Sequence, residues 1–196
     1  EISQLYLRMD RIEDAVKITE SVLEKSPDYE PALFLLANLY SSQKNFQKAI
    51  DTYLKLIKYD PSEVQIYIHL AYIYALNQEM DKAVRVLKDA VSMEPYNAMA
   101  RYYLGRIYVE TKEYDKAISE LEKAVELNQS FLDAFFMLGA AYESIEDNDN
   151  AILNYEKFLQ LNPRDTETRK RLTRLYFKLG LIEKVIGQLS EISHAE

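Results

Sequence analysis

Few residues in this sequence have the types and spacing that catalysis or metal binding requires. The chain of 196 residues contains no cysteine, which excludes disulfides, thiolate metal sites and a cysteine nucleophile. Of its two histidines, His69 is isolated within a predicted helix and His194 lies close to the C-terminal end. No glycine-rich loop of the kind that cradles phosphates is present. The sequence therefore predicts a non-catalytic protein without a metal or other cofactor.

The carboxylates are numerous but have the pattern of solvated helix faces. The chain carries 32 Asp and Glu against 24 Lys and Arg, a net charge of −8. Segments such as ESIEDNDN and SELEKAVE are typical of exposed helical surface with partners one turn apart. An acidic protein is a poor general ligand for nucleic acid or for a membrane surface. No run of about 18 apolar residues could span a membrane. We therefore expect a protein or peptide partner.

Four sets of similar residues recur at a spacing of 34 residues, and this periodicity is the strongest signal in the sequence. The first set is a row of tyrosines: Tyr6, Tyr40, Tyr74, Tyr108, Tyr142 and Tyr176. The second set is aliphatic: Ile2, Leu36, Leu70, Leu104, Leu138 and Leu172. A small residue follows each of these: Ser3, Ala37, Ala71, Gly105, Gly139 and Thr173. The fourth set consists of alanines and ends in a valine: Ala15, Ala49, Ala83, Ala117, Ala151 and Val185. We call these four sets the ladders.

The ladders resemble the pattern of the tetratricopeptide repeat (TPR) family, and the resemblance covers the whole chain. It implies an all-α, right-handed superhelical solenoid of antiparallel helix pairs, with the first helix of each pair lining a concave groove. One solenoid is expected over residues 1–196. Its repeats are a truncated one over 1–29, complete ones over 30–63, 64–97, 98–131 and 132–165, and a nearly complete one over 166–196. Because the chain begins at Glu1 without a methionine or a signal-type segment, we interpret it as a fragment of a longer protein.

Each ladder has a physical reason within this pattern. Leu33, Leu36, Ala37 and Tyr40 follow the i, i+3, i+4, i+7 spacing of one buried helix face. The small residue lets the second helix approach closely, while the larger neighbours fill the space around it. One helix pair cannot bury its own apolar face, so stability is expected to come from stacking neighbouring repeats. Tyr108, within ARYYLGRIYVE, is therefore predicted to be structural.

The face of each first helix opposite to the ladders is expected to line the groove. The predicted binding residues on this groove face are Phe34, Asn38, Ile68, Tyr72, Tyr102, Tyr103, Arg106 and Phe136. Four of them form an apolar row at the same position of successive repeats: Phe34, Ile68, Tyr102 and Phe136. Exposed apolar rows with polar rims usually mark interaction sites. The alternative is that these side chains only pack against neighbouring helices.

A basic segment stands out against the acidic chain. Residues 164–178 carry six basic and two acidic side chains. The predicted basic patch consists of Lys170, Arg171, Arg174 and Lys178. It would suit an acidic segment or a C-terminal carboxylate of a partner. The alternative is a solvated face paired with nearby acids such as Glu143 and Glu146.

Two main functions remain open from the sequence. The first is a scaffold that holds a peptide or helix of a partner protein in the groove. The second is a regulatory or targeting arm of a larger enzyme or of a secretion or assembly machine. RNA binding is disfavoured by the strict period of 34 and the acidic charge. End-to-end self-association is also expected, because the apolar positions Val185, Ile186, Leu189 and Ile192 lack a polar cap. The sequence does not determine the compartment; the cytoplasm is favoured, with the periplasm as the alternative.

Overall fold

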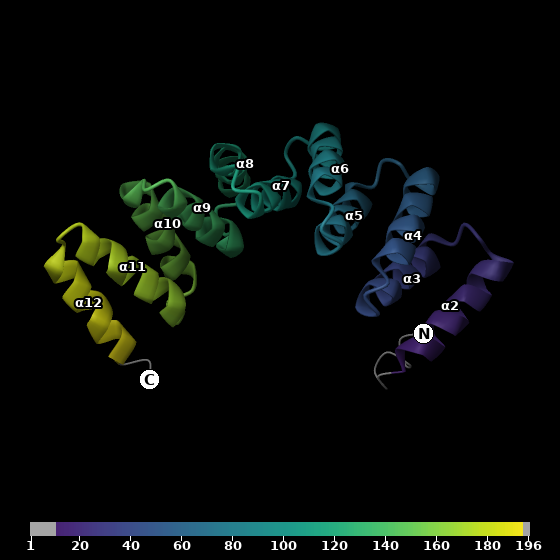
Figure 1. Cartoon of the computed structure of the whole chain (residues 1–196), viewed down its shortest axis with the longest axis horizontal. Helices are drawn as coiled ribbons and strands as arrows, with labels where there is room; N and C mark the ends of the chain where they lie inside the picture. The colour runs from purple at the N-terminus through teal and green to yellow at the C-terminus, as the bar shows by residue number, and fades with distance from the viewer. Residues whose placement is uncertain (1–10, 194–196) are drawn as a thin grey trace. The chain divides into compact units, whose positions relative to one another are not determined.

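The computed structural model describes residues 11–193. The ladder positions Ile2, Ser3 and Tyr6, and also His194, lie outside these residues. Within them the chain forms helices and no strands, in this order: α2 (Ile12–Lys25), α3 (Glu30–Ser42), α4 (Phe46–Tyr59), α5 (Val64–Leu76), α6 (Met80–Met93), α7 (Ala98–Glu110), α8 (Tyr114–Leu127), α9 (Leu132–Ser144), α10 (Asn148–Leu161), α11 (Thr166–Lys178) and α12 (Ile182–Ser193). Figure 1 shows these helices following one another along the chain.

Consecutive helices pack against each other in pairs. The pairs are α3 with α4, α5 with α6, α7 with α8, α9 with α10, and α11 with α12. The short turns within the pairs make the paired helices antiparallel. The predicted all-α fold of antiparallel helix pairs is therefore confirmed. In the described part of the chain, no helix has the length and apolar character needed to cross a membrane.

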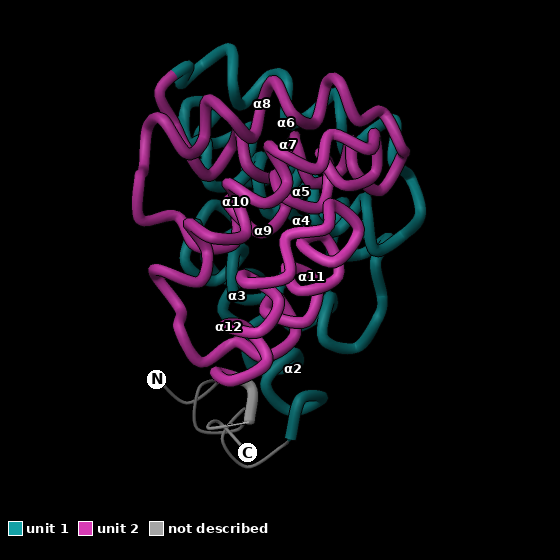
Figure 2. Tube along the Cα trace, turned by 90° about the vertical axis from the view of Figure 1, so that its left-hand side faces the viewer, with its two compact units in different colours: residues 1–95 teal, residues 96–196 magenta. Residues whose placement is uncertain are grey.

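The chain divides into two compact units, and we describe each by itself. Unit 1 comprises residues 1–95 and unit 2 comprises residues 96–196. They are drawn in different colours in Figure 2. In both units the alanines of the fourth ladder are completely buried, as at Ala49 and Ala151. In unit 2, a Cβ on Gly105 would lie 2.6 Å from Cγ of Leu121. The small ladder residue thus permits the close approach of paired helices that the sequence predicts.

The tyrosine ladder combines burial with hydrogen bonds. In three described repeats the hydroxyl donates to a glutamate twenty residues earlier, on the preceding second helix. Tyr40 donates to Oε1 of Glu20 at 2.5 Å, Tyr142 does so to Glu122 at 2.5 Å, and Tyr176 pairs with Glu156 in the same way. Burial, reinforced by the bond to Glu20, raises the pKa of the Tyr40 phenol to about 12. In these three repeats the bond ties the first helix to the second helix of the preceding repeat.

The turn within each described pair uses one backbone conformation. A residue with positive φ closes each first helix: Lys44, Gln78, Lys112, Glu146 and Gly180. Their φ angles lie between 57° and 72°, and only the last position has glycine. The following amide donates to the carbonyl of the ladder tyrosine, for example Asn45 to Tyr40 at 2.8 Å. This is the hydrogen-bond pattern of a Schellman motif.

Candidate functional site

In unit 1, three rings cluster beside the first helices. His69 of α5 meets Phe34 of α3 edge-on at 4.9 Å and stacks parallel to Tyr53 of α4 at 6.0 Å, both between ring centroids. The Tyr53 hydroxyl donates to Oδ1 of Asn38 at 2.7 Å. Burial raises the pKa of the Tyr53 phenol and lowers the pKa of His69. The cluster therefore favours the neutral form of both side chains.

Unit 2 contains a counterpart of this cluster, three periods of 34 residues later. Phe136 of α9 lies 5.9 Å from the ring of Tyr155 of α10, and the guanidinium of Arg171 lies 5.6 Å from the centre of the Phe136 ring. The Tyr155 hydroxyl donates to Oε2 of Glu143 at 2.7 Å, and Arg171 reaches the same oxygen at 3.4 Å. Arg171 thus stands at the position of His69, and Glu143 accepts the tyrosine hydroxyl as Asn38 does in unit 1, although Ala140 occupies the position equivalent to Asn38.

A pocket of about 270 Å³ opens beside this second cluster. Its lining residues are Tyr102, Asp133, Phe136, Met137, Phe158, Asp165, Glu167 and Thr168. The apolar part comes from α7, α9 and α10, while three carboxylates stand at the start of α9 and at or just before the start of α11. Thr168 is completely buried, and its hydroxyl has no hydrogen-bond partner among residues 11–193. Buried hydroxyls are normally paired, so the unpaired hydroxyl of Thr168 is an unusual feature of this pocket wall.

Two members of the predicted apolar row are not exposed, which corrects the expectation for them. Ile68 is only 2% exposed, because α5 carries apolar residues around most of its circumference and is buried on most sides. Tyr102 is 7% exposed, because the rings of Tyr103 and Phe131 cover it at 5.2 and 4.7 Å. Packing against neighbouring side chains, the alternative left open by the sequence, accounts for both. Tyr102 nevertheless contributes to the lining of the 270 Å³ pocket.

The other predicted groove residues are at least partly accessible. Phe34, Asn38, Tyr103, Arg106 and Phe136 are half-buried. Tyr72 is 41% exposed. The guanidinium of Arg106 lies 5.0 Å from the centre of the Tyr103 ring, a cation–π arrangement. The structure therefore brings Tyr102 and Phe136 together at one pocket, with Tyr103 and Arg106 next to Tyr102.

The predicted basic patch is partly engaged with acids. Arg171 lies 3.4 Å from Glu143 and 3.7 Å from Glu167, and Arg174 lies 4.0 Å from Glu167. The Lys178 ammonium lies 3.4 Å from Oδ1 of Asn148. Arg174 keeps 71% of its side chain exposed, and Lys170 is exposed as well. Such pairs contribute little where they are exposed.

Sequence reasoning missed Tyr53 and Tyr155, which anchor the two ring clusters. Both belong to second helices, whereas the search for binding residues followed the first helices. The sequence did contain a signal for them: tyrosine stands at this repeat position in Tyr53 and Tyr155, whereas the equivalent positions Leu87 and Leu121 carry leucine. Thr168 carried no signal, since only the packing of α11 shows that its hydroxyl is buried. Among residues 11–193, no group of three or more histidine or acidic side chains could hold a metal ion.

Comparisons with known proteins agree with this architecture. The model of the family described as "Tetratricopeptide repeat protein 21 C-terminal ARM domain" matches residues 32–180. No curated protein matches the chain. Among solved structures, MamA is 27% identical, with a TM-score of 0.75 over 82% of this chain and 94% of that one.

Two further structures show the same fold at lower identity. YrrB is 21% identical, with a TM-score of 0.71 over 91% of this chain and 92% of that one, and it is described as a TPR protein with an unusual peptide-binding site. PilF of Pseudomonas aeruginosa is 17% identical, with a TM-score of 0.79 over 95% of this chain and 85% of that one. The chain therefore has the fold of a TPR-like repeat protein.

Proposed function

Because the chain belongs to the family of the tetratricopeptide repeat protein 21 C-terminal ARM domain, we propose that it is a non-catalytic scaffold that binds a peptide or helix of a partner protein. The proposed binding surface is the groove face of the first helices. The peptide-binding site described for YrrB, a protein of similar fold, supports this type of function. The proposal depends on the site itself, since a fold alone does not determine function.

The observation that carries the proposal is the 270 Å³ pocket of unit 2. It combines apolar walls, to which Tyr102 and Phe136 contribute, with the carboxylates of Asp133, Asp165 and Glu167 in its lining. Ligand sites commonly have such apolar walls with a few polar groups that fix orientation. The volume suits one large apolar side chain of a peptide.

The charges around the pocket define the partner further. Asp133, Asp165 and Glu167 line it, so an apolar anchor with positively charged neighbours is favoured. Arg171 does not counter this preference, because Glu143 and Glu167 lie close to its guanidinium. We therefore propose a peptide with an apolar residue flanked by lysine or arginine.

The basic patch supports a second candidate partner, an acidic segment. Lys170 and Arg174 are exposed on α11, and Arg174 forms an ion pair with Glu167 at 4.0 Å. An incoming carboxylate would compete with Glu167 for this guanidinium. Affinity for such a partner would fall with salt, since exposed charges are screened beyond about 10 Å at 0.1 M. Charge reversal at Arg174 would weaken binding of an acidic peptide and strengthen binding of a basic one.

The experiment selects peptides from a random display library on the whole chain and then measures their affinity for two variants. Met137→Lys places a long cation at the pocket wall. Leu153→Lys is the matched control, because Leu153 is a 52% exposed apolar residue on α10 that is not part of the pocket lining. We expect Met137→Lys to weaken binding by about tenfold or more, as for an interface anchor. Leu153→Lys should leave affinity unchanged.

Two outcomes would contradict the proposal. Selected peptides that bind Met137→Lys as tightly as the unmodified chain do not use this pocket. Loss of binding in Leu153→Lys instead would place the surface on the second helices. The alternative role is a regulatory or targeting arm of a larger enzyme or of a secretion or assembly machine. Such an arm would also bind a partner through this surface. Pull-down with the full-length protein distinguishes that role by the assembly that is recovered.

A further inference from the structure

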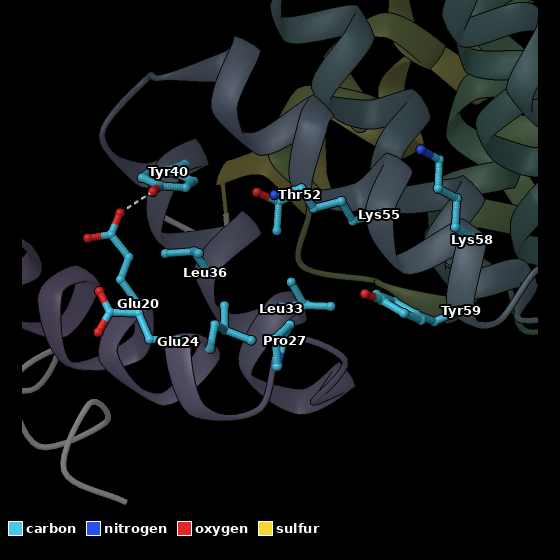
Figure 3. A pocket seen from close by; sticks show the side chains of 11 residues that line it. Glu20, Glu24, Pro27, Leu33, Leu36, Tyr40, Thr52, Lys55, Lys58 and Tyr59 are labelled. Atoms are coloured by element: carbon cyan, nitrogen blue, oxygen red, sulfur yellow. Dashed lines mark hydrogen bonds between the residues drawn. The ribbon is translucent and has the colours of Figure 1, made fainter.

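A second pocket lies in unit 1, between α2, α3 and α4, away from the ring cluster. Its volume is about 570 Å³. Leu33 and Leu36 of α3 lie at its centre with Pro27 (Figure 3). Glu20 and Glu24 of α2 stand on one side, and α4 supplies the opposite side. The lining residues on α4 are Thr52, Lys55, Lys58 and Tyr59. We call this pocket the α2–α4 slot.

Unit 2 contains a repeat-equivalent slot, four periods later, between α10, α11 and α12. Its volume is about 260 Å³. Most of its lining residues correspond in position and character to those of the α2–α4 slot: Glu156, Leu159, Leu172 and Tyr176 stand where unit 1 has Glu20, Leu23, Leu36 and Tyr40. Three positions differ: Arg169, Gln160 and Gln188 stand where unit 1 has Leu33, Glu24 and Thr52. The largest change in size and charge is Arg169 for Leu33.

Arg169 occupies part of the slot of unit 2 with its own side chain. It is only 8% exposed, and its two terminal nitrogens reach different acceptors. Nη2 donates to the carbonyl oxygen of Pro163 at 2.6 Å, and Nη1 donates to Oε1 of Gln188 at 2.8 Å. A planar guanidinium suits this arrangement because its N–H groups diverge in fixed directions.

In the other first helices, the position of Leu33 also carries a larger side chain. Tyr67 donates its hydroxyl to the carbonyl of Pro61 at 3.0 Å, the same acceptor position that Arg169 uses. Arg101 pairs with Glu120 at 2.6 Å, and Phe135 places a ring at this position of α9. Leu33 is shorter and has no donor to offer the carbonyl of Pro27. The α2–α4 slot is therefore larger than its counterpart, and its acceptors receive no side chain from this position.

We propose that the α2–α4 slot binds an arginine side chain of a partner protein, which takes the place that Arg169 fills in unit 2. The aliphatic part of this arginine would cover Leu33 and Leu36. Its guanidinium would donate to the carbonyl of Pro27 and to the carboxylate of Glu24. Glu20 adds a second negative charge on the same side, although one of its oxygens already accepts from Tyr40.

Charge and chemistry favour arginine over other side chains. Charge-assisted bonds to a carboxylate are roughly twice as strong as neutral ones. Lysine would present a single point charge and could not reach two divergent acceptors as a planar fork does. A purely apolar side chain would leave the carbonyl of Pro27 and the nearby carboxylates desolvated without a partner, which is unfavourable. Lys55 and Lys58 project from the opposite helix and favour an acidic residue next to the arginine in the partner (Figure 3).

The test uses small probes that represent the side chain alone, with the complete chain as the receptor. Acetyl-argininamide is compared with acetyl-citrullinamide, which has nearly the same shape without the charge, and with acetyl-norleucinamide, which is apolar. Binding is followed through the methyl NMR signals of Leu23, Leu33 and Leu36, which line the slot. We expect the arginine probe to bind at least tenfold more tightly than either of the others. Equal affinity of the three probes would overturn the proposal.

Two variants make the test specific to the slot. Leu33→Arg supplies the arginine from the chain itself, as at Arg169, and should remove binding of the probe while thermal stability is kept or raised. Glu24→Gln removes the charge of an exposed side chain and should weaken binding several-fold without a change in stability. Should Leu33→Arg fail to fold, Glu24→Gln still decides the outcome, because unchanged affinity in that variant contradicts the proposal. Met137→Lys, in the 270 Å³ pocket of unit 2, should not affect binding of this probe. The proposal for the α2–α4 slot and the proposed function can therefore be refuted independently.

Discussion

Gly139 of α9 lies directly against the ring of Tyr155 of α10: a Cβ on this glycine would be 2.8 Å from both Cδ1 and Cε1 of the ring. The tyrosine is completely buried and cannot move aside easily, because its hydroxyl is bound to Glu143. Alanine occupies the equivalent position in unit 1, at Ala37. The repeat pattern requires only a small residue at this position, whereas the short distance between α9 and α10 requires glycine.

Gly139→Ala should destabilise unit 2. Overpacking of a well-filled core typically costs about 1–3 kcal/mol, whereas replacing a helical glycine with alanine contributes about 1 kcal/mol in the opposite direction. We expect a net loss of up to about 2 kcal/mol in the free energy of unfolding. Urea titration followed by circular dichroism measures this change.

Gly187→Ala is the matched control for that experiment. Gly187 also lies within a helix, but a Cβ there would meet no atom within 4 Å. The helix-propensity gain should appear without a packing penalty, raising stability by about 0.5–1 kcal/mol. A rise in the free energy of unfolding in both variants would show that the ring of Tyr155 can shift to accommodate the added methyl group without a loss of stability.

The buried tyrosines of α7 should be costly to remove. Tyr108 is 4% exposed and Tyr102 is 7% exposed. Tyr108→Ala should lower the free energy of unfolding by about 3–5 kcal/mol, the usual range for aromatic core residues. Because Tyr102 is buried as well, Tyr102→Ala should lower the free energy of unfolding by about 2–4 kcal/mol.

Tyr72→Ala provides the comparison for these two variants, because Tyr72 is 41% exposed on α5. Its effect should stay within about 1 kcal/mol. Thermal melts of the three variants, monitored at several wavelengths, would also reveal whether the array unfolds in one step. A Tyr102→Ala change as mild as Tyr72→Ala would mean that the Tyr102 ring does not stabilise the fold.

The stability of unit 1 should depend on pH through His69. Burial holds its pKa below the ordinary value of 6.5, so the unfolded chain binds a proton more readily than the folded one. The contribution of neutral His69 is therefore fully present above about pH 6.5 and is lost as the pH falls through the folded-state pKa. His69→Phe keeps a ring against Phe34 and Tyr53 but cannot titrate. Unfolding measured between about pH 7.5 and 5.5 should show a steeper loss of stability in the unmodified chain than in His69→Phe; parallel curves would refute this.

The apolar face of α12 should promote self-association. Ile182, Ile186 and Leu189 are 53%, 63% and 52% exposed, and they lie on one side of the helix at i, i+4 and i+7. Exposed apolar faces of this kind usually mark interaction surfaces. Sedimentation velocity at rising concentration should show a growing oligomer fraction that Ile186→Lys abolishes. A strict monomer at high micromolar concentration would exclude this contact.

The fold class could be predicted from the sequence because repetition amplifies weak signals. A single tyrosine or alanine indicates little, whereas four ladders in register determine the period and the buried face. The helix ends are less dependent on individual residues than the pattern implies. Helix α8 ends at Leu127 although Gln129 replaces the proline found at Pro61, Pro95 and Pro163. Stacking of the repeat, together with the turn that follows, is sufficient to end this helix.

The candidate sites were only partly predictable, because they depend on contacts between helices. A helical wheel gives the direction of Tyr102 but not whether Phe131, at the start of the next first helix, will cover it. Arg169 belongs to the basic segment of the sequence, yet its side chain is buried against Pro163 and Gln188. Both cases require knowledge of how far a neighbouring element extends over a given position, which periodicity alone does not contain.

The positive φ shared by the turns means that substitutions there can raise the stability of this chain. A residue other than glycine pays about 1 kcal/mol or more for a positive φ, and four of the five turns have Lys, Gln or Glu at that position. Glycine at Lys44, Gln78, Lys112 and Glu146 would relieve this strain, with a gain of roughly 0.5–1 kcal/mol at each turn after the added entropy of the unfolded chain is included. Because stability in a repeat array is close to a sum over neighbours, these gains should accumulate. Substitutions in the turns should therefore raise the free energy of unfolding without changing the 270 Å³ pocket of unit 2 or the α2–α4 slot.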